Sequence, residues 1–139
     1  MKLTSLILTE GQREDQMIER VITEILAMSV TSHFWHWQTK SYAAHEALGE
    51  FYTKLTEIAD QLAESFMGMG GSFNVGVDTH MSSFSVNRAV EELRELKGLL
   101  VETVNQLTTQ ENGAHQGCAD IIIDGIKEID KLRYLLTLD

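Results

Sequence analysis

The sequence predicts a single all-α domain over residues 1–139, built as a four-helix bundle. Proline is absent, which removes the commonest helix breaker from the whole chain. Leu, Ala, Met, Glu and Gln, all strong helix formers, are plentiful. Apolar side chains also recur at helical spacing in four separate segments, so four helices can bury one common core.

The first two helices are predicted over about residues 12–38 and 42–67. The first carries its apolar side chains at helical spacing at Met17, Val21, Ile25 and Met28. The second does so at Leu48, Tyr52, Leu55, Ala59, Leu62 and Phe66. Without a break they would form one helix of about 56 residues, far beyond the usual length. We therefore place a tight turn at residues 39–41, where Thr39 or Ser41 can cap the second helix.

A glycine- and serine-rich segment over residues 68–85 predicts a long middle loop between two up-down helix pairs. Ser85 is the expected N-cap of the third helix, whose apolar positions run from Val86 to Leu107. An Asn-Gly turn signal within residues 111–117 ends that helix. The fourth helix follows, with Cys118, Ile122, Ile126, Ile129, Leu132 and Leu136 along one side.

Charge and composition exclude several classes of function. The net charge is -10, from 21 acidic and 11 basic side chains, so the surface repels phosphate backbones and attracts cations. No stretch approaches the roughly 20 apolar residues of a membrane span, and no secretory leader is recognisable at the start. The single cysteine, Cys118, cannot form an internal disulfide and is expected to be a small buried side chain. We expect a cytoplasmic protein without membrane contact.

Histidines and carboxylates in the first two helices are the candidate functional residues. His33 and His36 share one side of the first helix, and His45 follows the turn. Asp60 and Glu64 are spaced i, i+4 along the second helix, at the border of its apolar side. Histidines at such positions are commonly structural. Carboxylates combined with histidines are also a ligand set for zinc, manganese or iron, so both interpretations stay open.

The spacing restricts any metal site that uses all of these residues. His45 and Asp60 are 15 residues apart on one helix, which is about 22 Å at ~1.5 Å per residue. They can therefore meet at one ion only if a second copy of the helix runs antiparallel in a two-fold dimer. A di-iron centre inside one subunit is disfavoured, because the chain contains no Glu-x-x-His motif. The break at residues 39–41 is what would let His36 and His45 face one ion.

The order His36-Trp37, His45-Glu46 and then Asp60-x-x-x-Glu64 resembles the Dps group of mini-ferritins, DNA-binding proteins from starved cells. The segment "ADIIIDGIKEIDKLRYLL" in the fourth helix is similar to the closing helix of that family. The resemblance implies a ferritin-like fold and a dodecameric, hollow shell. It also implies a di-iron or mono-iron ferroxidase centre between subunits. Its metal ligands would be His36 and His45 from one subunit, and Asp60 and Glu64 from the other.

The resemblance further implies that ferrous iron is oxidised there by peroxide or oxygen and stored as ferric mineral. Gly49 stands where the family has a further carboxylate, so the alternative is a structural or binding protein with a degenerate, non-catalytic metal site. No DNA binding is expected through the N-terminal tail, which lacks the lysines of many members. His33 is expected to pack beside the site, Trp35 and Trp37 to pack in the core or an interface, and His115 to be solvated.

Overall fold

The computed structural model describes residues 8–73, 81–109 and 113–138. They form four α-helices: α1 (Glu10–Gln38), α2 (Tyr42–Gly68), α3 (Val86–Thr108) and α4 (Gln116–Leu136). These ranges contain no β-strand, which confirms the predicted all-α four-helix bundle. None of the four helices combines the length and the apolar character needed to cross a membrane.

Side-chain caps explain where three of the helices begin. Thr9 forms a capping box with Gln12 at the start of α1. Ser41 accepts a hydrogen bond from the backbone N–H of Ala44, 3.1 Å away, so it caps α2, while Thr39 is the C-cap of α1. Ser85 caps α3 as predicted. The predicted turn at residues 39–41 is therefore confirmed; the predicted turn residue Asn112 lies outside the described residues.

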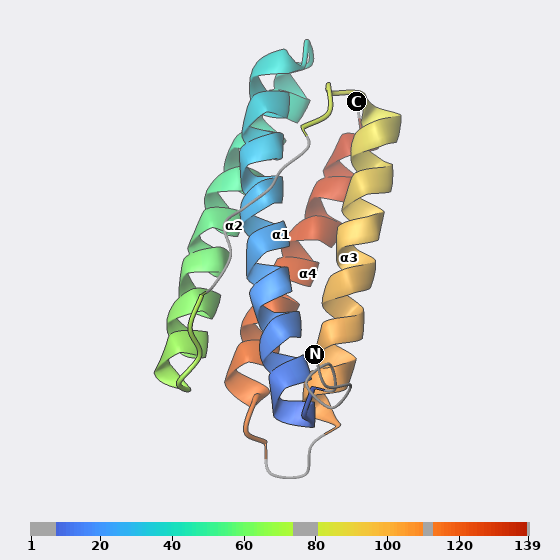
Figure 1. The fold of residues 1–139 in the computed structure, drawn as a ribbon. Coiled ribbons are helices and arrows are strands. Elements are labelled where there is room, and N and C mark those ends of the chain that lie inside the picture. Colours follow the sequence, from blue (N-terminus) through green and yellow to red (C-terminus); the bar gives the residue numbers. More distant parts are fainter. Residues whose placement is uncertain (1–7, 74–80, 110–112, 139) are drawn as a thin grey trace, which may run out of the picture.

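The helices stand at the corners of a square in the order α1, α2, α4, α3. Figure 1 shows that α2 ends at the lower end of the bundle and α3 begins at the upper end, so these two run in the same direction. The middle connection must therefore travel the length of the bundle, while the connections from α1 to α2 and from α3 to α4 turn back directly. The two antiparallel pairs agree with the prediction of up-down pairs joined by a long middle loop, and the structure adds that α2 and α3 run parallel.

The end of the middle connection is held against the upper end of α1. Trp35 is fully buried, and its indole N–H donates to the backbone oxygen of Ser82 at 2.9 Å. The side-chain oxygen of Gln38 accepts from the backbone N–H of Phe84 at 2.7 Å. The Trp35 ring also contacts the Phe84 ring. These contacts connect the start of α3 to the histidine-bearing end of α1.

One continuous apolar core fills the centre of the bundle. Its fully buried members come from all four helices and include Ile25, Leu55, Leu62, Leu100 and Ile122. Gly125 on α4 lets that helix approach closely, because a Cβ there would lie 3.2 Å from Leu100. Close packing of this kind makes the core sensitive to the loss of even a few methylene groups.

Two exposed ion pairs join α4 to its neighbours. Lys131 bonds Glu50 on α2 at 2.9 Å, and Lys97 on α3 bonds Asp130 at 2.6 Å. The hydrogen bond from Lys131, and then its positive charge, lower the pKa of the Glu50 carboxyl. Pairs this exposed contribute little to stability, so apolar packing is the main stabilising term.

We predict that Leu100→Ala lowers the free energy of unfolding by about 2–5 kcal/mol, because it leaves a cavity among all four helices. Val101→Ala is the matched control, since Val101 is 38% exposed on the next position of the same helix. It should change stability by less than about 0.5 kcal/mol. Urea unfolding at one fixed protein concentration measures both. Equal effects for the two variants would contradict this assignment of the core.

Candidate functional site between α1 and α2

The three clustered histidines lie together at the upper end of the α1–α2 pair. His33 stacks on Tyr52 of α2, with ring centroids 3.8 Å apart and planes 14° apart. The His33 ring also packs against Trp37 at 4.4 Å. His33 therefore has the packing role expected from the sequence. Of the two tryptophans, Trp35 belongs to the core, whereas Trp37 is 60% exposed.

His36 and His45 form a reciprocal clasp across the turn. Nδ1 of His36 lies 2.6 Å from the backbone oxygen of His45, and Nδ1 of His45 lies 2.8 Å from the backbone oxygen of His36. A carbonyl oxygen only accepts, so each Nδ1 must carry the hydrogen and donate it. In the neutral ring, Nε2 is then the nitrogen with the free lone pair. Metal-binding histidines commonly have this arrangement, with a backbone carbonyl fixing the tautomer.

The two clasped rings are stacked rather than convergent. Their centroids are 3.7 Å apart and their planes differ by 17°. Ring-nitrogen lone pairs lie in the ring plane, so two nearly parallel rings direct them along nearly parallel lines. A single ion at ~2.0–2.1 Å from both nitrogens would require one ring to rotate. The turn brings the two histidines together, but in the observed ring orientations they do not direct their lone pairs at one ion.

Gly49 is explained by the position of the His36 ring. A Cβ at Gly49 would lie 3.0 Å from Cε1 and 3.2 Å from Nδ1 of His36. The imidazole therefore occupies the space that a side chain at position 49 would need. In the sequence, Gly49 stood out because a carboxylate was expected at that position. In the structure, the glycine leaves room for the His36 ring, which reaches the backbone of α2.

Asp60 and Glu64 lie far down α2, with both side chains exposed. Within the described residues, neither is in an ion pair with a basic side chain. Asp60 lines a groove of about 450 Å³ between α1 and α2, together with Leu26, Ala59 and Phe73. The carboxylates and the histidines are thus on one pair of helices but at opposite ends of it.

No three His, Cys, Asp or Glu side chains come together as a metal-binding group in residues 8–73, 81–109 and 113–138. A site shared between two chains needs a second copy, so ligation by His36, His45, Asp60 and Glu64 stays a prediction.

Sequence reasoning missed a buried pair at the lower end of the bundle. Glu14 on α1 is fully buried, and its Oε2 lies 2.8 Å from Nδ1 of His115, without the alignment of a good N–H···O hydrogen bond. His115 was expected to be solvated, but it is only 8% exposed. The position of His115 directly before α4 did not predict its burial, because its partner Glu14 is about 100 residues away in the sequence.

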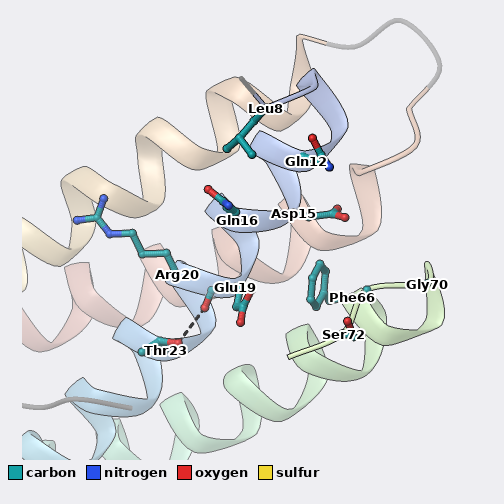
Figure 2. A pocket seen from close by; sticks show the side chains of 11 residues that line it. Leu8, Gln12, Asp15, Gln16, Glu19, Arg20, Thr23, Phe66, Gly70 and Ser72 are labelled. Carbon is teal, nitrogen blue, oxygen red and sulfur yellow. Dashed lines mark hydrogen bonds between the residues drawn. The ribbon is translucent and has the colours of Figure 1, made fainter. Parts of the chain in front are cut away.

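A second hollow, of about 580 Å³, lies beside this lower end, between the start of α1 and the end of α2. Figure 2 shows its wall, where the Phe66 ring lies opposite polar side chains of α1 that include Asp15 and Glu19. Arg20 is the cation among its lining residues. The mixture of one aromatic ring with opposite charges does not define a particular ligand.

Comparisons with known proteins do not support the resemblance to mini-ferritins. The model of a family of unknown function, DUF5856, matches residues 36–136. A curated protein of Enterobacteria phage T4, the uncharacterized 14.6 kDa protein in the mobD-ri intergenic region, is 21% identical over 119 residues, covering 83% of this chain and 84% of its own. No solved structure matches the chain.

The predicted membership of the Dps group is therefore wrong, since the matching family is a different one. The motif that suggested it consists of a few histidines and carboxylates on two helices. Two helices with polar residues at that spacing are compatible with more than one family. The twelve-subunit shell depended on the resemblance alone and is not retained.

We predict that Gly49→Asp fails to add a metal ligand and instead destabilises the clasp by about 1–3 kcal/mol, because its Cβ would lie 3.0 Å from the His36 ring and force that ring to shift against its hydrogen bond. Gly98→Asp is the matched control, since Gly98 lies inside α3 with nothing within 4 Å of a built Cβ. That change should cost less than about 0.5 kcal/mol. Urea unfolding gives both values, and a stable Gly49→Asp protein would contradict the proposed role of the glycine.

We also predict that Cys118 reacts slowly with a thiol reagent in the folded protein. The side chain has no solvent exposure, and burial raises the pKa of the Cys118 thiol, so the reactive thiolate is scarce near neutral pH. Unfolding in urea should restore the rate of an ordinary free cysteine. Labelling at equal speed in the two states would show that this part of the core opens readily.

Proposed function

Since the chain belongs to the family of unknown function DUF5856, we propose its function from the site itself: it binds divalent transition-metal ions, with ferrous iron as the first candidate. The proposed ligands are Nε2 of His36 and His45 from one copy, and the carboxylates of Asp60 and Glu64 from a second copy. Imidazole and carboxylate together suit iron, manganese and zinc.

The single observation that carries this proposal is the reciprocal clasp. Because both Nδ1 atoms donate to carbonyl oxygens, both neutral rings keep Nε2 as the nitrogen available to a metal. The exposed Asp60 and Glu64 can supply the negative charge that balances a divalent cation. The net charge of -10 favours the approach of cations in general.

The finer form of the proposal is that bound ferrous iron is oxidised to ferric iron at the site. Each ferrous ion would give up one electron, and peroxide or oxygen would accept the electrons and be reduced to water. We include a cytoplasmic location in the proposal, which the one unpaired, buried thiol favours.

A second candidate follows from the packing of His36 against Gly49. In it the histidines serve only to hold α1 to α2, and the protein is a structural or binding protein with a non-catalytic metal site. The stacked geometry of the rings favours this candidate, because the lone pairs do not converge on one ion. The two candidates differ in whether metal affinity depends on the distant carboxylates.

The test is an anaerobic calorimetric titration with ferrous iron. We predict that Asp60→Asn combined with Glu64→Gln weakens binding at least ~10-fold, as expected for losing charged ligands. The matched control is Asp120→Asn combined with Asp124→Asn, an exposed i, i+4 pair on α4, which should leave affinity unchanged. The number of ions bound also distinguishes one shared ion from two neighbouring ions on the stacked rings.

Admission of oxygen or peroxide after the titration tests the finer form. Ferric absorbance should then rise faster in the wild-type protein than in the Asp60→Asn/Glu64→Gln variant. If the Asp60→Asn/Glu64→Gln and Asp120→Asn/Asp124→Asn variants bind ferrous iron with equal affinity, the second candidate is supported instead of the first. If the wild-type protein binds ferrous iron but oxidises it no faster than the Asp60→Asn/Glu64→Gln variant, only the ferroxidase step of the proposal is rejected.

A further inference from the structure

A groove of about 710 Å³ runs along α3, and α4, which lies beside α3 in Figure 1, contributes to its wall. Its lining includes three basic side chains, Arg94, Lys97 and Arg133. Three of the 11 lysines and arginines of the chain therefore gather at one groove, in a protein whose net charge is -10.

The pairing of α3 with α4 brings these cations to one end of the groove. Asp130 of α4 bonds Lys97 of α3 at 2.6 Å, which fixes the relative level of the two antiparallel helices. Arg133 lies three residues further along α4, so it shares the side of Asp130 and lies about one turn higher. One turn above Lys97 on α3, which runs in the opposite direction, is Arg94.

Arg133 is the cation of this group whose charge has no partner in the part of the chain that the structure describes. Its side chain is partly buried, and its Nε is buried without a hydrogen bond. None of the ion pairs of the described residues includes it. A buried donor that lacks a partner costs about 1–3 kcal/mol, and such a group calls for a water molecule or an ion as its explanation.

The other two cations keep donors for a ligand although each forms an ion pair. Lys97 gives a hydrogen bond to Asp130, and Nη2 of Arg94 gives one to Glu91. An ammonium and a guanidinium each carry more donors than one hydrogen bond uses. Three cations against these two carboxylates leave an excess of positive charge, which is that of Arg133.

Gly98 leaves the middle of the groove open. A Cβ built there would meet nothing within 4 Å, and its φ is not positive, so neither packing nor backbone conformation requires a glycine. Glycine in a helix interior nevertheless costs about 0.5–1 kcal/mol relative to alanine. A long side chain at this position would lean back over the preceding turn of α3, which carries Arg94. Its absence keeps that end of the groove accessible.

The lower part of the groove limits the charge of a ligand. Glu102 lines it one turn below Gly98 and would repel a second anionic group or a long polyanion. Further down, Asn105 and Gln106 offer amide donors and acceptors, and Val101 adds an exposed apolar side chain. A ligand that suits the whole groove is therefore anionic at its upper end and uncharged along its body.

We propose that the α3–α4 groove binds a small molecule with one phosphate or carboxylate group, which pairs with the Arg133 guanidinium beside Arg94 and Lys97. The planar guanidinium matches both kinds of oxyanion with two parallel hydrogen bonds. The groove shares no residue with the metal site proposed between α1 and α2, so the two proposals are tested independently.

The first experiment is a nuclear magnetic resonance titration of the full chain at constant low ionic strength, with inorganic phosphate and with acetate. The Arg133 Nε–H and Gly98 backbone N–H signals should shift and saturate, because the anion reaches the buried donor at the upper end of the groove. The probe that binds more tightly identifies the anionic group as phosphate or carboxylate. A titration in which neither anion shifts these signals would overturn the proposal.

Charge variants separate this site from a general response to net charge. Arg133→Gln should weaken binding of the tighter anion at least ~10-fold, as expected for losing a charged hydrogen-bond donor. Arg13→Gln on α1 is the matched control, because it removes the same charge from an exposed arginine outside the groove, and it should leave affinity unchanged. Equal weakening by the two variants would contradict a site at Arg133.

A second variant fills the groove without removing a charge. Gly98→Leu should weaken anion binding while it leaves the helical fold intact, since leucine is a better helix former than glycine. Gly11→Leu on α1, where a built Cβ also meets nothing within 4 Å, is its control and should bind as the wild type does. Circular dichroism confirms the fold of each variant. Unchanged binding in Gly98→Leu would place the anion outside the groove.

Adenosine monophosphate and a single-stranded oligonucleotide test the expected size of the ligand. Adenosine monophosphate should bind more tightly than inorganic phosphate, because its uncharged body reaches the amides of Asn105 and Gln106. Equal affinity would reject the part of the proposal that concerns the body of the ligand. Tighter binding of the oligonucleotide than of adenosine monophosphate would overturn the small-molecule assignment in favour of nucleic acid.

Discussion

The reciprocal hydrogen bonds between His36 and His45 are the constraint on which the candidate site depends. Each imidazole donates to the backbone oxygen of the other residue, at 2.6 and 2.8 Å, so the side chains connect two helices through their main chains. Gly49 supplies the space for the His36 ring. With these contacts in place, the register of α1 against α2 is set, and His33 lies level with Tyr52.

The same contacts determine what the histidines can do. A ring held through Nδ1 has a defined tautomer and presents Nε2, which suits a metal ligand. A stack with centroids 3.7 Å apart also binds the rings to each other, which suits a structural clasp. The two roles compete where one ion is shared, because one ring would have to rotate out of the stack to bind it. Because His45 and Asp60 are about 22 Å apart along α2, the proposed ligand set requires residues from two chains.

Helix positions were predictable because their causes are local. Ser41 and Ser85 cap the helices that follow them, and the absence of proline allows each apolar pattern to run uninterrupted. The role of Gly49 was not predictable, since it depends on a ring from another helix. The pairing of Glu14 with His115 was hidden for the same reason. The family resemblance failed because a short pattern of metal-binding residue types is not specific to one family.

The sequence by itself determined an all-α bundle of four helices, the turn at residues 39–41 and a long middle connection, because caps, helix propensity and apolar periodicity act over a few residues. Only the tertiary structure decided that His36 and His45 stack on one another, that Gly49 accommodates a ring and that Glu14 is buried beside His115. Those features arise from contacts between helices. Their geometry depends on how far each helix is shifted and rotated against its neighbour, which periodicity does not specify.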